Sequence, residues 1–412
     1  MQIPSPLRRA ALVAVALLAI SPLAAAAAPP GNPLDEDAPL WVNPRSTTLK
    51  AAEGLTGDAR EDALLLASVP SASWLTGGTA NEVKRDVRRL VAGAHSDAAV
   101  PVLVAYNLPF RDCSQYSSGG ARSAAEYRAW IDAFAKGIGN KDAVVILEPD
   151  GLGIIPWHTT ASGELEWCRP AEADPETAAT ERYEMLEHAV DVLSALPRTA
   201  VYLDGTLSAW LNVGDISGRL IEAGVERADG FFLNVSNYSL TEREIAYGTW
   251  ISRCIDLALH ASRDTASCPS QFHPADPGDF STWPLTDAAF DQAYAEAGLV
   301  PDEARQPHFV IDTSRNGVGT WTPTEVYPDP QVWCNPPDRG LGARPTTSTG
   351  HALIDAYLWI KVPGESDGEC YRGTGGPEDP ARGAVDPPAG HWFTEMADEL
   401  IDNAVPAIAH GG

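Results

Sequence analysis

Short apolar runs alternate with amphipathic stretches along most of the chain. The runs are rich in β-branched residues, and in the stretches between them apolar residues recur every three or four positions, which is typical of helices. Runs that are apolar at nearly every position indicate strands buried on both faces. The pattern therefore predicts a parallel α/β sheet. Strands are predicted at 99–107, 143–149, 199–205, 230–237 and 308–314, and helices at 124–138, 179–196, 216–225 and 241–259.

Carboxylates and amides follow these runs within a few residues of their carboxyl ends. In a closed or nearly closed β/α barrel the carboxyl ends of the strands converge on one face, so we expect these side chains to share a cleft. A single Asp or Asn in such a place is also favoured as a helix N-cap. Because Asp or Asn recurs after several strands, we favour a functional site. The residues are Asp112, Asp150, Asp204, Asn234, Asp312 and Asp367.

Two of these carboxylates are candidates for opposite roles in acid–base chemistry. Asp150 ends the run VVILEPDGLG, where Pro149 helps to terminate the strand. A free Asp is ionised at neutral pH, but burial and a neighbouring carboxylate such as Asp112 would raise its pKa and keep it protonated. Asp367 has Lys361 nearby, a cation that favours the ionised form. Hydrolysis of a glycosidic bond requires such a pair, one carboxyl group as acid and one as base.

Aromatic residues in loop-like surroundings offer platforms on which sugar rings stack. Trp74, Tyr106, Trp210 and Trp333 lie among Gly, Ser and Asn residues rather than at helical core spacing. Each of them, taken alone, is equally compatible with a place in the core.

The first 28 residues have the pattern of a secretory signal peptide. Arg8 and Arg9 precede a short apolar run, and small residues fit for cleavage follow near Ala28. The run is shorter than the roughly twenty apolar residues that span a bilayer. We therefore predict a secreted protein, without membrane attachment after cleavage, whose residues 29–412 form one catalytic domain. A proline-rich stretch over 250–306 is predicted to be a surface insertion, and no separate carbohydrate-binding module is evident.

Charge and cysteine content exclude several classes of function. The net charge of −27 would repel nucleic acid. The chain has six cysteines, an even number that favours disulfides in an exported protein and leaves their pairing open. The cysteine spacing does not fit a zinc site and no HExxH motif occurs, so we predict neither a metal nor a cofactor.

Two long segments resemble the signature segments of glycoside hydrolase family 6, the cellulases that cleave β-1,4-glucan with inversion. These are YNLPFRDCSQYSSGGA (106–121) and VVILEPDGLG (144–153). The likeness continues in the same order through VYLDG, FLNVSNY, FVIDTSRNG, WCN and WIKVPGESDG, and so covers most of the chain. The resemblance implies a single distorted, partly open β/α barrel with loop insertions.

The resemblance also implies roles for individual residues. Asp150 matches the general acid, Asp112 the carboxylate that raises the pKa of the acid, Asp204 a further carboxylate near the scissile sugar, and Asp367 the base, acting directly or through water. Tyr106 and Ser118 match neighbouring catalytic positions, Lys361 and Glu365 sugar-binding neighbours of the base, Trp74, Trp210 and Trp333 sugar-stacking positions, and Asn234, Asn237, Arg315 and Asn316 polar positions of the cleft. By the same resemblance Cys113 pairs with Cys168 and Cys334 with Cys370, which leaves Cys254 for Cys268.

Two departures from the family pattern bear on substrate preference. Leu207 stands where family members commonly carry a histidine, and only Gly368 and Glu369 separate Asp367 from Cys370, where chain-end enzymes have a long loop. The short loop favours an endoglucanase that acts, as a monomer, on cellulose and β-1,4-linked gluco-oligosaccharides. The alternatives are a cellobiohydrolase, an inactive glucan-binding protein and a metal-dependent hydrolase built on the Asp cluster.

Overall fold

The computed structural model describes residues 1, 32–35, 37–160 and 163–409. The predicted signal peptide, residues 1–28, lies almost wholly outside the described residues, so its cleavage near Ala28 stays a prediction. In the part of the chain that is described, no helix combines the length and the apolar character that crossing a bilayer would take.

Seven parallel strands form a curled half-barrel, with the strands in sequence order from one edge to the other. The first and last strands are the two edges of the sheet, which makes the barrel partly open, as predicted. The strands are β1 (Ser73–Leu75), β2 (Val102–Ala105), β3 (Ala143–Leu147), β4 (Thr199–Asp204), β5 (Gly230–Leu233), β6 (His308–Asp312) and β7 (Ile354–Leu358).

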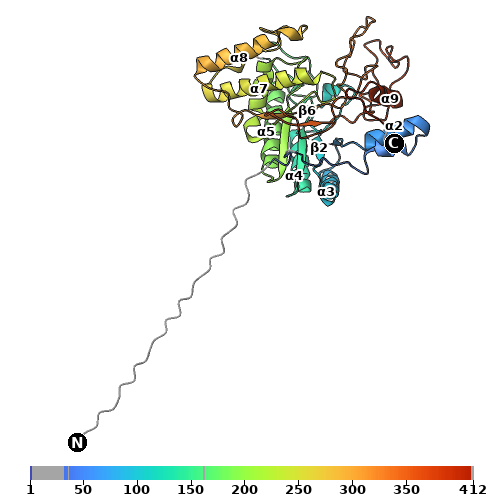
Figure 1. Cartoon of the computed structure of the whole chain (residues 1–412), viewed down its shortest axis with the longest axis horizontal. Coiled ribbons are helices and arrows are strands. Elements are labelled where there is room, and N and C mark those ends of the chain that lie inside the picture. Colours follow the sequence, from blue (N-terminus) through green and yellow to red (C-terminus); the bar gives the residue numbers. More distant parts are fainter. Residues whose placement is uncertain (2–31, 36, 161–162, 410–412) are drawn as a thin grey trace.

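Helices follow β1 to β5 and pack on the outside of the sheet (Figure 1), whereas no helix of the described residues lies between β6 and β7. Thr79 and Ser123 accept hydrogen bonds from the backbone of the first turn of α3 and α4, so these helices begin at the residues that follow. Near the C-terminus α9 packs against α2, at one side of the molecule. The helices are α1 (Thr47–Ala52), α2 (Gly57–Ala67), α3 (Ala80–Ser96), α4 (Ala124–Ile138), α5 (Ala178–Ser194), α6 (Val213–Glu222), α7 (Thr241–Ala261), α8 (Pro284–Ala297) and α9 (Thr394–Asp402), with short 3-10 turns η1 (Asp112–Ser114), η2 (Val225–Arg227), η3 (Thr265–Ser267) and η4 (Phe280–Thr282).

Alternate residues of each strand belong to two different core layers. In β3, Val145 and Leu147 pack under the helices, whereas Val144 and Ile146 fill the interior of the barrel. All of β3 is buried. This explains the nearly continuous apolar runs, because a strand in this position is covered on both faces.

The structure differs from the predicted surface insertion over 250–306. The first part of that range is the second half of α7, in which Trp250, Cys254 and Ile255 are fully buried. Phe290 and Tyr294 of α8 are also buried. The apolar residues of α7 keep their helical spacing past residue 250. The predicted start of the insertion was therefore wrong, because the prolines on which it was based lie only in the later part of the range.

The three predicted disulfides are present: Cys113–Cys168, Cys254–Cys268 and Cys334–Cys370. The second ties Cys254, within α7, to the segment that leads to α8. The first and the third lie next to carboxylates of the predicted site, and thereby anchor the loops that carry Asp112 and Asp367.

Candidate active site

A cleft of about 680 Å³ lies at the carboxyl ends of the strands. Segments that are far apart in the sequence meet there, from the turn after β2 to the loop after β7. Most of the predicted site residues line it: Trp74, Tyr106, Asp112, Ser118, Asp150, Trp210, Asn237, Trp333, Lys361, Glu365 and Asp367.

The backbone turns sharply where the first two carboxylates enter the cleft. Asp150 has φ 62° and Asp112 has φ 55°, both in the left-handed region that residues with a side chain seldom adopt. Glu148, two residues before Asp150, also has a positive φ of 56°. Conformations of this kind cost about 1–3 kcal/mol each and persist where the surroundings fix them, which often happens in active sites.

The environment of Asp150 favours its protonated form. Burial, followed by the negative charges of Asp204 and Asp112, raises the pKa of Asp150 well above its usual value. The hydroxyl group of Tyr106 lies 3.5 Å from Oδ2 of Asp150 and favours the ionised form only weakly. These effects together favour the protonated form of Asp150, which is the form that a general acid requires.

Asp112 is held by the loop that carries it. Burial raises the pKa of Asp112 to about 6, against the opposing effects of a hydrogen bond from Ser117 N and of the charge of Arg111. The Arg111 guanidinium donates to the carbonyl groups of Thr76, Tyr106 and Ser117, and lies 4.5 Å from the centre of the Tyr106 ring. Arg111 thus pins this loop beside Asp150.

Replacing Asp112 with asparagine is expected to move the alkaline limb of the pH profile to lower pH. The negative charge of Asp112 raises the pKa of Asp150, so its removal lets Asp150 lose its proton earlier as the pH rises. We expect a shift on the order of one pH unit in the kcat/KM profile for a soluble cello-oligosaccharide. Asp402→Asn, at an exposed position, is the control. An alkaline limb that does not move would contradict the coupling.

Asp367 has the opposite environment. Burial alone would raise its pKa, but Arg315 and Lys361 outweigh burial and hold the pKa of Asp367 below its usual value. Arg315 Nη1 lies 2.9 Å from Oδ2, and Lys361 Nζ lies 3.2 Å from Oδ1. Tyr238 donates to Oδ2 at 3.3 Å. Asp367 is therefore ionised and rigidly held.

Aromatic side chains and a further carboxylate form the rest of the cleft wall. Trp74 donates from Nε1 to the carbonyl group of Ile360, which fixes its ring, and Trp210 packs directly on Gly153. Trp333 lies against Tyr116, with 5.8 Å between ring centres. Burial raises the pKa of Glu365, which accepts a hydrogen bond from Thr47.

Five of the predicted site residues lie behind the cleft surface rather than on it: Asp204, Asn234, Asp312, Arg315 and Asn316. Asp312, which was expected to share the cleft, is buried and accepts hydrogen bonds from Ser314 N and Lys361 N. Asp204 accepts hydrogen bonds from Leu152 N and Gly153 N and acts on Asp150 through its charge. Asn234 and Asn316 both donate to the carbonyl group of Ser239, and Arg315 is fully buried against Asp367. We infer that these side chains brace the loops of the site instead of contacting the substrate.

The sequence analysis did not predict two buried side chains that support the site, Glu148 and Tyr238. Glu148 accepts hydrogen bonds from Asn107 N and Leu108 N, and burial raises its pKa to about 7. It faces away from the cleft and fixes the turn that leads to Asp112. Tyr238, which donates to Asp367, was also missed. The sequence offered one signal for it, because its hydroxyl-bearing side chain follows the predicted strand in the segment FLNVSNY.

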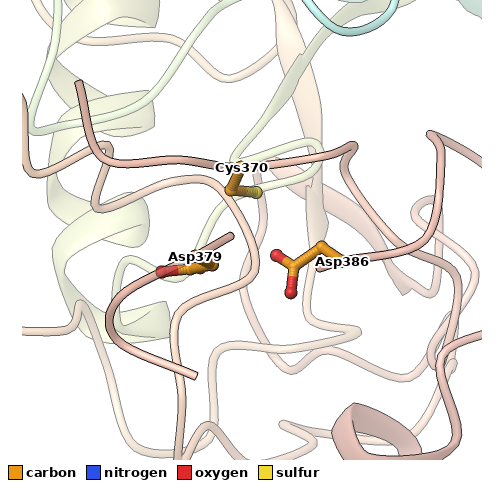
Figure 2. Close-up of side chains that lie close together, drawn as sticks. All are labelled: Cys370, Asp379 and Asp386. Atoms are coloured by element: carbon orange, nitrogen blue, oxygen red, sulfur yellow. The ribbon is translucent and has the colours of Figure 1, made fainter. Parts of the chain in front are cut away.

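One cysteine and two aspartates, Cys370, Asp379 and Asp386, form a buried cluster in the segment that follows Asp367. Ligand atoms of Cys370, Asp379 and Asp386 lie within 4.8 Å of one another (Figure 2). The sulfur of Cys370 is bonded to Cys334, and both oxygens of Asp379 accept hydrogen bonds from Arg372. A disulfide sulfur is no thiolate ligand, so the donor set fits an ion-pair network and not a metal site.

Comparison with known proteins agrees with this geometry. Residues 35–404 match the family described as glycosyl hydrolases family 6. Endoglucanase 1 from Streptomyces halstedii is 32% identical, with 94% of this chain and 97% of that protein aligned. Endoglucanase A from Thermobispora bispora is 31% identical over 87% of this chain, but the alignment spans only 64% of that longer protein.

A solved structure has a similar fold. It is the endoglucanase Cel6 from Mycobacterium tuberculosis, in complex with methyl-cellobiosyl-4-deoxy-4-thio-β-D-cellobioside. It is 35% identical, with a TM-score of 0.65, and the match covers 90% of this chain and 99% of that chain. Because the family match covers residues 35–404 and the chain folds as a half-barrel of parallel strands, this chain belongs to glycosyl hydrolase family 6.

Proposed function

We propose that the protein is a secreted, inverting endo-β-1,4-glucanase that hydrolyses internal bonds of cellulose. The observation that carries the proposal is the contrast between two carboxyl groups of one cleft: Asp150 has a strongly raised pKa and Asp367 a lowered one. Inverting glycosidases need such a pair, since one group protonates the leaving oxygen while the other activates water on the opposite face of the sugar.

The chemical steps follow from these protonation states. Asp150 donates its proton to the glycosidic oxygen as the bond to the anomeric carbon breaks. Water attacks that carbon from the other side, and Asp367 accepts the proton that the water releases, directly or through a second water. Burial and the negative charges of Asp204 and Asp112 favour the protonated form of Asp150 before the reaction, and neither Asp204 nor Asp112 transfers a proton in these steps. The indoles of Trp74, Trp210 and Trp333 line the cleft and would hold the sugar chain in line with the two carboxyl groups.

Internal cleavage is favoured by the openness of the cleft near the base. Only Gly368 and Glu369 lie between Asp367 and Cys370, and no residue of 371–388 lines the described cleft. That segment packs instead on the loop 330–337. Because residues 371–388 do not line the cleft, we propose that a glucan chain enters it from the side.

A cellobiohydrolase is the second candidate. The chain is also 29% identical to a probable 1,4-β-D-glucan cellobiohydrolase C from Aspergillus terreus, over 92% of this chain and 77% of that protein. Tyr116, which lines the cleft, contacts both Trp333 and Tyr371 and donates to Gln331, so the rim is narrowed at this point. Tyr116 also lies against Gly368, next to Asp367, so these contacts bring the loop after β2 against the segments that carry Trp333, Asp367 and Tyr371.

The viscosity of carboxymethylcellulose separates the two candidates. We expect a fast fall in viscosity for little reducing sugar released, because each internal cut shortens the polymer substantially. A proportionate release of reducing sugar with little thinning would identify chain-end action. The anomer of the first product of soluble cello-oligosaccharides, followed by NMR, tests inversion: the α-anomer is expected, and the β-anomer would contradict the mechanism.

A further inference from the structure

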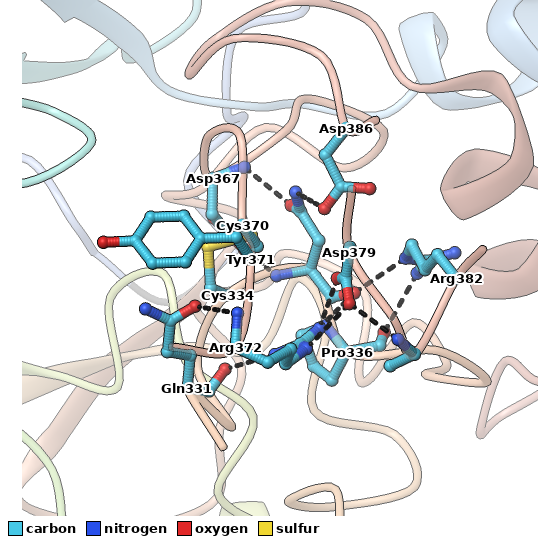
Figure 3. Close-up of polar contacts among 12 residues, drawn as sticks. Gln331, Cys334, Pro336, Asp367, Cys370, Tyr371, Arg372, Asp379, Arg382 and Asp386 are labelled. Atoms are coloured by element: carbon cyan, nitrogen blue, oxygen red, sulfur yellow. Dashed lines mark hydrogen bonds and ion pairs between the residues drawn. A yellow bond between two sulfur atoms is a disulfide. The ribbon is translucent and has the colours of Figure 1, made fainter. Parts of the chain in front are cut away.

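The segment 371–388, here called the strap, is hydrogen-bonded to the loop 330–337. Arg372 and Asp379 are both fully buried and form an ion pair at 2.8 Å (Figure 3). Arg372 also donates to the carbonyl groups of Pro330 and Gln331, and Arg382 donates to that of Asn335. Buried guanidinium groups with this many partners hold the strap and the loop 330–337 as one rigid unit.

Asn335 connects this unit to Asp367 at several points. Its side-chain Oδ1 accepts a hydrogen bond from Asp367 N at 2.7 Å, and its own backbone N donates to Asp367 Oδ2 at 3.0 Å. Its Nδ2 donates to Gly368 O at 2.9 Å, immediately after the base. One fully buried residue thus holds both the backbone and the carboxylate of Asp367.

Asp386 of the strap holds Asn335 in turn. Asn335 Nδ2 donates to Asp386 Oδ2 at 2.8 Å and to Ser366 Oγ at 3.0 Å. The two amide hydrogens are therefore shared among three acceptors, which fixes the plane of the amide and its orientation. The other oxygen of Asp386 is buried and has no hydrogen-bond partner among the described residues.

The unpartnered oxygen of Asp386 lowers the stability of the fold. An unpartnered buried polar atom costs about 1–3 kcal/mol. Burial raises the pKa of Asp386 to about 6, and the charges that face it are those of Asp379, Arg382 and Arg372. Within the described part of the chain, the carboxylate of Asp386 thus has a hydrogen bond to only one of its two oxygens, and that bond comes from the Asn335 amide that holds Asp367.

We propose that Asn335 and Asp386 are positioning residues for Asp367, forming a hydrogen-bonded chain from the strap to the catalytic base. The proposal rests on the proposed function, in which Asp367 accepts the proton from water. Neither residue lines the cleft, so neither contacts the substrate. Their effect is on geometry: a shift of about 1 Å in a reacting group can cost on the order of 100-fold in rate.

The first test is Asn335→Ala. We expect kcat for cellotetraose to fall by about 10–100-fold, while KM changes by less than about twofold, because the sugar-binding surface is untouched. The same loss is expected on a dinitrophenyl cello-oligosaccharide, whose good leaving group bypasses the acid but still requires the base. Asn140→Ala, at an exposed asparagine at the end of α4, is the control and is expected to behave as the wild type.

A matched pair at Asp386 keeps the proposal testable if Asn335→Ala does not fold. Asp386→Asn keeps an oxygen that can accept from Asn335 Nδ2, whereas Asp386→Leu has none. We expect Asp386→Leu to lose kcat by about 3–10-fold, the cost of one hydrogen bond, and Asp386→Asn to recover most of it. In both variants KM for cellotetraose should stay unchanged.

The outcomes separate the two levels of the proposal. If Asp367→Asn abolishes hydrolysis but Asn335→Ala and Asp386→Leu keep full kcat, the positioning chain is wrong and the base stands. If kcat and KM deteriorate together in Asn335→Ala and Asp386→Leu, these residues have only a structural role and the positioning proposal is overturned. If Asp367→Asn remains active, the proposed base itself is wrong.

Discussion

Asp150→Ala is expected to lower kcat for cellotetraose by about 10²–10⁴-fold, the usual contribution of a general acid. The carboxyl group that burial, Asp204 and Asp112 keep protonated is then gone, and no proton reaches the leaving oxygen. Hydrolysis of a dinitrophenyl cello-oligosaccharide should be largely spared, because that leaving group departs without protonation. The comparison of the two substrates is the measurement.

The variant should bind as well as the wild type. Trp74, Trp210 and Lys361 make the cleft walls and are unchanged, so the Kd of cellotetraose, measured by titration calorimetry, should remain within about twofold. Asp398→Asn, at an exposed position on α9, is a matched control for the loss of a carboxylate. Equal losses on the two substrates would contradict the assignment of Asp150 as the acid.

The central strands could be predicted from the sequence because burial on both faces leaves a nearly continuous apolar run. β3 and β4 are buried at every position and were placed correctly. β1 was missed, since its three residues Ser73–Leu75 are only partly buried and too short to give a pattern. In β7 buried residues alternate with partly buried ones, so no continuous run marks it.

The direction of a side chain was harder to predict than its position. Glu148 and Asp150 end the same run, yet Glu148 is buried against Asn107 and Leu108 while Asp150 reaches the cleft. The left-handed backbone at both residues sets these directions, and no residue type in the run requires it. Asn234 illustrates the same limit, because it follows β5 as a cleft residue would and is fully buried beneath the surface.

Asp367→Ala is expected to affect catalysis and stability together. Without the base, kcat should fall on cellotetraose and on the dinitrophenyl substrate alike, which distinguishes this variant from Asp150→Ala. The substitution also leaves the buried Arg315 and the nearby Lys361 without their counter-charge. Removing one partner of a buried ion pair costs about 3–5 kcal/mol, so the free energy of unfolding in denaturant should fall by that amount at neutral pH.

The pH dependence of this stability difference gives a sharper test. The pKa of Asp367 is lowered in the folded protein, so its ionisation stabilises the fold above the unfolded pKa, near 3.9, and this contribution is lost as the pH falls through the folded value. The stability difference between wild type and Asp367→Ala should therefore shrink in acid. A difference that stays constant with pH would mean that Arg315 and Lys361 do not hold Asp367 in its charged form, and the assignment of Asp367 as the ionised base would then lose its physical ground.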